Sequence, residues 1–331
     1  MNSRSTRPVI TVLTGGLLEQ KPNLSSLAAE ADVRIANSAA ELAETLPGSE
    51  VLLVWDYRFA DIGPLIPQTP SLCWIHAASV GVDPLLSPQL SEADQVVLTN
   101  SRGVFDVAIA EYVAMLLLAR VKRFAETLTL QSKKQWKHRM TANLTNRTVA
   151  VVGTGSIGRR IATLLKNLGM DVRLVGRRGF QDDDFGEVPA VTRLSTLAHE
   201  VDFLVLAAPM TEQNRHMVDA DVLAALGPNG YLVNIGRGGL IDTKALEAAL
   251  TAGTLGGAAL DVFDEEPLPV QSMLWSHPEV TVSPHMSGDF EGYDTALVEA
   301  FAENFGRWRR GEPLRNVVDT ERGYVASGHS L

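Results

Sequence analysis

The segment VAVVGTGSIGRRIATLLKNLG, which begins at Val149, restricts the fold of this chain more than any other. A strand-like apolar run is followed by three glycines at GxGxxG spacing and then by an apolar pattern of helical period. The spacing alone is weak, but its place between a strand and a helix makes it specific. Gly153 permits a tight turn, Gly155 lets the backbone approach a pyrophosphate, and Gly158 allows close helix packing. With the free amides of the helix N-terminus, the segment predicts a dinucleotide-binding α/β unit.

The rest of the chain repeats this alternation of apolar runs and helical patterns, which is typical of parallel sheets with crossover helices. The sequence therefore predicts an α/β fold with two Rossmann-like domains and an active site in the cleft between them. The runs expected to be strands are VITVLTGG, DVRIANS, EVLLVWD, SLCWIHAAS and QVVLTNS in the first hundred residues, and VDFLVLAAP, GYLVNIG, GGAALDVF and VTVSPH later.

Two helical segments mark the domain boundaries. The pattern from Phe105, FDVAIAEYVAMLLLARVKRF, continues into a mixed basic tract and predicts one long helix that leaves the first domain. The segment YDTALVEAFAENFGRWRR predicts a helix that returns to it. We therefore expect a substrate-binding domain of residues 1–102 and 290–331 and a dinucleotide-binding domain of residues 103–289.

Composition excludes several classes of partner. The 331 residues carry 29 basic and 39 acidic side chains, a net charge of −10, so general attraction to nucleic acid or an anionic membrane is not expected. The N-terminus lacks a long apolar run, and we expect a cytoplasmic protein. One cysteine, Cys73, excludes an internal disulfide and a multi-cysteine metal site, and we expect no metal.

The end of the strand VRLV bears on the choice of cofactor. An acidic residue here would bond the ribose 2′-hydroxyl of NAD, whereas an arginine accommodates the 2′-phosphate of NADP. Gly176, Arg177 and Arg178 occupy this position. Glycine removes the repulsion of a carboxylate, and a guanidinium can pair with phosphate through forked hydrogen bonds. We therefore expect NADP, with NAD as the weaker alternative; the competing interpretation is a solvated turn.

Three polar side chains follow later strands: Arg237 in VNIGRGGLID, Glu266 in LDVFDEEPLP and His285 in VTVSPHMSG. At these residues the chain resembles the D-isomer-specific 2-hydroxyacid dehydrogenases, and the similarity covers nearly its whole length. It is closest to an NADP-preferring branch like the glyoxylate/hydroxypyruvate reductases. The motifs that carry it include WIHAASVGVD, TNSRGVFDVAIAEYV, GTGSIG, NIGRGGLID, GAALDVFDEEPL and SPHMSG.

The resemblance implies a catalytic group that the residue types also support. Arg237 would clamp the substrate carboxylate and polarise the carbonyl, because its planar fork matches both tasks. His285 would be the general acid, and Glu266 would hold its ring and favour its protonated form. The backbone amides of Val80 and Gly81 would be a second hold on the carboxylate.

Other positions match the family only by comparison. Trp55, followed by Asp56 and Tyr57, is expected to contact the substrate, although an ordinary turn explains these residues equally well. The remaining histidines are interpreted as structural: His76, His138, His199, His216, His277 and His329. Beyond the glycines and arginines already named, the residues expected to line the cofactor groove are Ser156, Ile157, Ala208, Pro209, Ile235, Asp261, His285 and Gly288.

These features predict an oxidoreductase that reduces a small 2-keto acid, such as glyoxylate or hydroxypyruvate, to the D-2-hydroxy acid with NADPH. The resemblance also implies a homodimer. The alternative is a dinucleotide-sensing protein like the co-repressor branch of the same fold, which keeps the catalytic residues but turns over little substrate.

Overall fold

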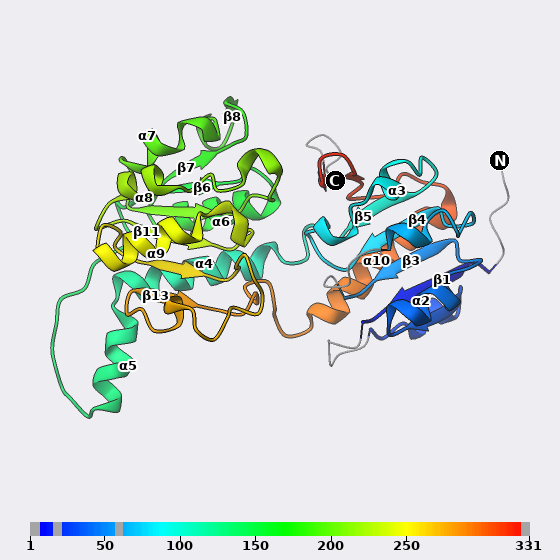
Figure 1. Cartoon of the computed structure of the whole chain (residues 1–331), viewed down its shortest axis with the longest axis horizontal. Coiled ribbons are helices and arrows are strands. Elements are labelled where there is room, and N and C mark those ends of the chain that lie inside the picture. The colour runs from blue at the N-terminus through cyan, green and yellow to red at the C-terminus, as the bar shows by residue number, and fades with distance from the viewer. Residues whose placement is uncertain (1–6, 16–21, 57–61, 326–331) are drawn as a thin grey trace. The chain divides into compact units, whose positions relative to one another are not determined.

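The computed structural model describes residues 7–15, 22–56 and 62–325 and divides into two compact units. The first contains Met1–Val104 and Phe290–Leu331, and the second contains Phe105–Asp289. Each unit is built on its own parallel sheet (Figure 1). The predicted α/β class with two Rossmann-like sheets is confirmed.

The first unit has a five-stranded sheet in the order β2-β1-β3-β4-β5, with all neighbours parallel. Strands β3 and β4 are buried along their whole length, which explains the continuous apolar run VLLV of β3. The helix predicted at the C-terminal end, α10 (Tyr293–Arg310), belongs to this unit. The strands are β1 (Val9–Leu13), β2 (Asp32–Ala36), β3 (Val51–Val54), β4 (Trp74–Ala77) and β5 (Val97–Asn100). The shorter elements are α1 (Ser25–Ala28), α2 (Ala39–Thr45), α3 (Pro88–Ser91), β14 (Val318–Asp319) and β15 (Tyr324–Val325).

The second unit has a six-stranded parallel sheet in the order β13-β12-β11-β10-β6-β7. Strand β6 lies between β7 and β10, so the strand order reverses there, which is where ligands collect in such sheets. The strands are β6 (Thr148–Val152), β7 (Asp171–Val175), β10 (Phe203–Leu206), β11 (Tyr231–Asn234), β12 (Ala258–Leu260) and β13 (Val280–Val282). A small antiparallel hairpin, which the sequence did not predict, is formed by β8 (Phe180–Asp182) and β9 (Gly186–Val188).

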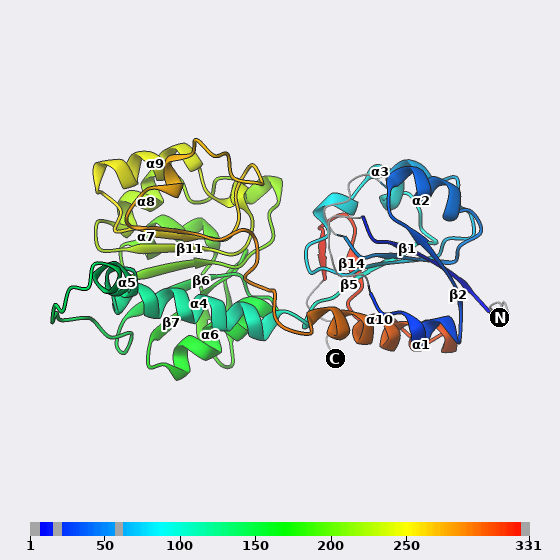
Figure 2. The ribbon, with the colours of Figure 1, turned by 90° about the horizontal axis from the view of Figure 1, so that it is seen from below.

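Helices cover both faces of this second sheet (Figure 2). One core lies between the sheet and the helices that follow β7 in the chain. The other lies between the sheet and two helices that pack on each other, one of which follows the glycine-rich loop. The first group is α7 (Leu194–Ala198), α8 (Ala220–Leu226) and α9 (Thr243–Ala252), and the second is α4 (Asp106–Val121) and α6 (Ser156–Asn167). With both faces covered, the carboxyl edge of the sheet is the place where polar side chains can gather.

The prediction of one long helix from Phe105 through the basic tract is wrong, because two separate helices occupy this segment. The helix α4 stops at Val121, Arg123 adopts a left-handed φ of +51°, and a second helix, α5 (Phe124–Ser132), begins after it. The physical reason is that α5 has no buried residue, so no packed face continues the direction of α4. Figure 1 shows α5 standing off the sheet of its unit.

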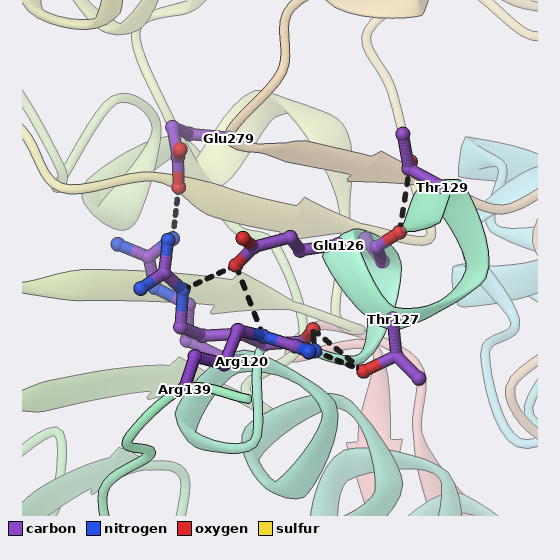
Figure 3. A network of polar contacts seen from close by, with 8 residues as sticks. Arg120, Glu126, Thr127, Thr129, Arg139 and Glu279 are labelled. Carbon is purple, nitrogen blue, oxygen red and sulfur yellow. Dashed lines mark hydrogen bonds and ion pairs between the residues drawn. The ribbon is translucent and has the colours of Figure 1, made fainter. Parts of the chain in front are cut away.

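A network of charged side chains fixes the two ends of this interruption (Figure 3). Arg139, from the segment after α5, forms an ion pair of 3.2 Å with Glu126 and contacts the Thr127 hydroxyl. Arg120, in the last turn of α4, pairs with Glu279 just before β13 and donates to the carbonyl oxygen of Gly256 at 2.7 Å. These contacts attach α4 to the sheet and α5 to the segment that follows it.

Candidate active site and cofactor site

The glycine-rich loop joins β6 to α6 and closes tightly on the neighbouring backbone. Gly153 has a φ of +130°, and a Cβ on it would lie 2.5 Å from the carbonyl oxygen of Ala207. A Cβ on Gly158 would lie 1.9 Å from the Gly153 carbonyl oxygen. A Cβ on Gly155, in contrast, would meet no described heavy atom within 4 Å. The loop is therefore open only where a pyrophosphate would approach, and these residues fit a dinucleotide.

The other residues expected to line the cofactor groove gather at the same edge of the sheet, because its strands are parallel. The positions are Ser156 and Ile157 at the start of α6, Ala208 and Pro209 after β10, and Ile235 after β11. Gly288 packs beside Phe105, where a Cβ on the glycine would lie 3.2 Å from the ring. Contact of these residues with a cofactor stays a prediction.

Strand β7 ends at Val175, as the sequence predicted, and Arg177 and Arg178 are exposed beyond it. Gly176 is buried: its amide donates to Pro189, and its carbonyl oxygen accepts from Val191 at 2.7 Å. A Cβ on Gly176 would lie 2.9 Å from the carbonyl oxygen of Arg178. Packing therefore favours glycine here independently of the charge argument, and an acidic side chain would require the backbone of Arg178 to move.

His285 and Glu266 lie in direct contact. The Nδ1 atom of His285 and a carboxylate oxygen of Glu266 are 2.8 Å apart, and the other carboxylate oxygen accepts from the amide of Phe263 at 2.9 Å. The two side chains are 31% and 36% exposed, so the pair remains accessible. With Nδ1 directed at Glu266, Nε2 is the ring atom that can present a proton to a substrate.

The pKa of Glu266 is lowered from its usual value. Burial, the largest single influence, acts to raise this pKa, but several groups outweigh it. These are the hydrogen bond from His285, the hydrogen bond from the Phe263 amide, and the positive charges of His285 and Arg237. The carboxyl group therefore stays ionised to a more acidic pH than a free glutamate, and its negative charge faces the His285 ring.

We expect Glu266→Gln to lower kcat/KM for keto-acid reduction ~10-fold or more at neutral pH and to remove the acid-side fall that comes from protonation of Glu266. The amide keeps the shape of the side chain but loses the charge that faces His285. The measurement is kcat/KM as a function of pH. The matched control is Glu265→Gln, since Glu265 is an exposed neighbour. A pH profile that is the same in Glu266→Gln and in the wild type would exclude the pairing as a catalytic device.

The turn that carries Arg237 is shaped by a buried asparagine at the end of β11. Asn234 has no exposed surface, and its side chain donates to the carbonyl oxygen of Arg237 at 2.8 Å and accepts from the amide of Gly236 at 3.0 Å. Asn234 was not among the residues expected from the sequence. The signal that could have found it is the polar residue that ends the apolar run YLV, because a polar group buried at the end of a strand has to be held by hydrogen bonds.

The Arg237 turn packs against the segment that leads to Glu266. A Cβ on Gly238 would lie 2.0 Å from the carbonyl carbon of Phe263, so the two backbones touch. The charge of Arg237 also contributes to the lowered pKa of Glu266. The structure thus brings Arg237, Glu266 and His285 together in the second unit.

In the first unit, Val80 and Gly81 follow β4 in a turn held through their carbonyl oxygens. Asn100 donates to the carbonyl oxygen of Val80 and the Ser79 hydroxyl donates to that of Gly81, both at 2.7 Å. The amides of Val80 and Gly81 donate to no acceptor within residues 7–15, 22–56 and 62–325. Two adjacent amides without an internal acceptor are suited to holding a carboxylate, and this role stays a prediction.

His76 lies in the core of the first unit and has a fixed hydrogen-bonding pattern. The Ser101 hydroxyl donates to the carbonyl oxygen of Ala77 at 3.0 Å, so His76 Nε2 donates to that hydroxyl at 3.2 Å. In the neutral ring Nδ1 then accepts from the Thr99 hydroxyl at 2.7 Å, and this hydroxyl accepts from the indole of Trp74 at 2.8 Å. Burial lowers the pKa of His76 to about 3. The ring is a neutral structural group, as the sequence interpretation held.

The residues proposed beside the substrate side chain are less accessible than expected. Trp55 is 3% exposed and Asp56 is fully buried. Tyr57 and His329 lie outside the described residues. Substrate contact by Trp55 stays a prediction.

A cavity of about 280 Å³ lies behind the segment that carries Glu266. Its walls include Leu246 of α9 together with Leu260, Val262 and Leu274. Arg237, Glu266 and His285 are not among its lining residues, so this cavity is separate from the acid–base pair.

Among the described residues, no group of three or more His, Cys, Asp or Glu side chains could hold a metal ion. None of the helices in that part of the chain is long and apolar enough to cross a membrane.

Comparison with known proteins agrees with this geometry. Residues 114–287 match the family model for the NAD binding domain of D-isomer specific 2-hydroxyacid dehydrogenases. A glyoxylate/hydroxypyruvate reductase of Arabidopsis thaliana is 36% identical over 257 residues, which cover 77% of this chain and 80% of that protein. The chain belongs to the D-isomer specific 2-hydroxyacid dehydrogenase family. It is an oxidoreductase with a dinucleotide-binding Rossmann domain, and the resemblance inferred from its motifs is confirmed.

Solved structures give the same result. An NADPH-dependent glyoxylate/hydroxypyruvate reductase from Sinorhizobium meliloti, in complex with NADP and sulfate, has a TM-score of 0.81 at 26% identity. It covers 96% of this chain and 100% of its own. A D-isomer specific 2-hydroxyacid dehydrogenase from Xanthobacter autotrophicus, in complex with NADPH and MES, has a TM-score of 0.81 at 27% identity and covers 95% of this chain and 100% of its own.

Proposed function

We propose that this chain catalyses the NADPH-dependent reduction of a small 2-keto acid, such as glyoxylate or hydroxypyruvate, to the D-2-hydroxy acid. The observation that carries the proposal is the 2.8 Å contact between His285 and Glu266 beside the turn of Arg237. The names of the Arabidopsis and Sinorhizobium relatives support this substrate class.

In this proposal each residue has one task. When bound, the reduced nicotinamide supplies the hydride to the carbonyl carbon. Arg237 holds the substrate carboxylate and polarises the carbonyl through its forked donors. His285, held in place by Glu266, gives its Nε2 proton to the carbonyl oxygen. The amides of Val80 and Gly81 offer further donors for a carboxylate, and we assign substrate binding to the first unit and dinucleotide binding to the second.

The preference for NADP is supported by two observations. The end of β7 presents Gly176 and two exposed arginines in place of an acidic side chain. The Sinorhizobium and Xanthobacter structures were solved with NADP and NADPH. NAD remains an alternative, because the family model describes an NAD binding domain. It is the weaker alternative, because no acidic side chain stands at the end of β7.

The test is NADPH oxidation with a panel of 2-keto acids that includes glyoxylate, hydroxypyruvate and pyruvate. We expect turnover in the ordinary enzymatic range of ~1 to 1000 per second with at least one of them. Turnover below roughly 0.01 per second with every acid, together with tight NADPH binding, would instead support the dinucleotide-sensing alternative. The homodimer and the cytoplasmic location expected from the sequence stay predictions.

The arginines at the end of β7 should set the cofactor preference. If Arg177 or Arg178 holds the 2′-phosphate, its replacement by alanine should weaken NADPH binding by roughly 10-fold to 150-fold, or ~1.5 to 3 kcal/mol. The lower end is expected, because both side chains are exposed and salt screens the contact. NADH binding should change little. The measurement is kcat/KM for each cofactor at one keto-acid concentration and ionic strength.

The single variants identify which arginine makes the contact. Gly176 is kept in all of them, because a side chain there would collide with the Arg178 carbonyl and confuse a structural defect with an electrostatic one. Arg173→Ala is the matched control, since Arg173 lies on β7 a few residues before these arginines and its side chain pairs with Glu200. A ratio of NADPH to NADH efficiency that stays unchanged in Arg177→Ala and Arg178→Ala would mean that these arginines form only a solvated turn.

A further inference from the structure

An aromatic ring lies against the residue at which β7 gives way to the arginine turn. A Cβ on Gly176 would lie 3.2 Å from Cε1 of Phe180 and 3.4 Å from the side-chain methyl of Thr154. Phe180 begins β8, the first strand of the small hairpin, and Thr154 stands between the first two glycines of the glycine-rich loop. These two apolar groups therefore border the space that a side chain at residue 176 would take.

Phe180 is only partly covered by the chain. It is 41% exposed, although phenylalanine is among the side chains that folding most often buries. The ring lies at the carboxyl edge of the sheet, because Gly176 directly follows the last residue of β7. Ligand sites of α/β sheets form at this edge, and aromatic side chains commonly line them. The exposed part of the ring is therefore available to pack against a ligand.

The hairpin fixes Phe180 before any ligand binds. Phe180 pairs with Val188 of β9, which is fully buried in the core of the second unit. The carboxylate of Asp182 pairs with Arg159 on α6 and accepts from two amides of the hairpin turn, at 3.1 Å and 3.2 Å. The ring thus needs little further ordering on binding, which lowers the entropic cost of using it as a contact.

The space beside Gly176 has a defined meaning in dinucleotide sites. In an NAD site, the acidic side chain at the end of this strand bonds the 2′-hydroxyl of the adenosine ribose. The 2′-carbon of that ribose is bonded to the carbon that carries the adenine base. A flat apolar ring that borders this space is therefore suited to the base, since nucleic acid bases stack on aromatic side chains.

We propose that Phe180 is a binding residue for the adenosine half of the cofactor, on which the adenine base packs. This inference rests on the proposed function, because it takes the cofactor to be NADPH with NADH as the weaker alternative. It divides cofactor recognition into two parts. The ring makes an apolar contact that both dinucleotides share, and the arginines before it make a charged contact that only the 2′-phosphate offers.

The experiment measures the Kd of NADP, NAD and 2′,5′-ADP for the full chain by isothermal titration calorimetry. In Phe180→Ala we expect each Kd to rise ~10-fold, by factors that agree within about 2-fold, because all three ligands carry the adenosine. The factor should be the same at low and high ionic strength, because no charge is removed. The arginine variants should instead weaken only the two phosphorylated ligands, by a factor that shrinks with salt.

Two further variants separate stacking from bulk and from general surface effects. Phe180→Leu keeps an apolar side chain but loses the flat face, so we expect a smaller rise in each Kd than in Phe180→Ala. Phe124→Ala is the matched control, since Phe124 is a phenylalanine of the same unit, on α5, and is 53% exposed. We expect this control to bind all three ligands as the wild type does.

Two results would overturn the proposal. One is a Kd for NADP and for NAD that is the same in Phe180→Ala and in the wild type. The other is a loss confined to NADP and 2′,5′-ADP, since the ring would then act by supporting the arginines. Turnover is not measured, so a substrate panel without turnover would reject the proposed reaction while these Kd values still decide the adenosine contact.

Discussion

Substitution of His285 by alanine is expected to lower kcat for keto-acid reduction by ~10²-fold to 10⁴-fold, which is the usual contribution of a positioned general acid. The carbonyl oxygen then has to take its proton from water. The KM for NADPH should change little, because the pyrophosphate is held at the glycine-rich loop. The measurement is steady-state kinetics with the best keto acid of the panel.

The backbone at His285 calls for a second variant and a control. Alanine is strained at a φ of +53°, so His285→Asn is the companion variant, because asparagine tolerates the left-handed region. His216 also has a φ of +53° and is exposed, so His216→Ala reproduces the backbone effect without the chemistry. Near-normal turnover in His285→Asn would exclude the role of general acid, whatever the alanine variant does.

Replacement of Arg237 by lysine is expected to lower kcat/KM for the keto acid ~10²-fold while leaving NADPH affinity within about 2-fold. Lysine keeps the positive charge but loses the planar fork that would bind the carboxylate and the carbonyl together. The turn itself should persist, because Asn234 binds the backbone of residue 237 and not its side chain. The measurements are kcat/KM and the Kd for NADPH.

Arg215→Lys is the control for this substitution, since Arg215 is an exposed arginine near the same turn, beside Gly239. We expect it to have wild-type efficiency. If Arg237→Lys weakens NADPH binding and spares the keto acid, the carboxylate clamp has been assigned to the wrong residue.

The sequence by itself determined the strands and the edge of the sheet where the site would form. Runs such as VLLV and FLVL are apolar along their whole length because strands of a covered parallel sheet are buried on both faces. Each run ends in a polar or glycine-rich segment, and parallel strands place all those ends at one edge. Arg237 and His285 could therefore be singled out from local pattern and motif resemblance alone.

Only the tertiary structure decided the contacts that hold these residues. The helix break at Arg123 depends on whether α5 finds a surface to pack on, which its own sequence does not state. Asn234 and Asp261 are ordinary polar residues in the sequence, but folding buries each where neighbouring amides need an acceptor.

The hydrogen bonds from Ser283 and Ser287 to Asp261 join different segments of the chain, and they exist because β12 lies beside β13. Local spacing encodes strands and turns, whereas the orientation of an acid such as His285 depends on side chains brought together from distant segments. That is the physical reason why the sequence predicted the catalytic group and the folded chain revealed what positions it.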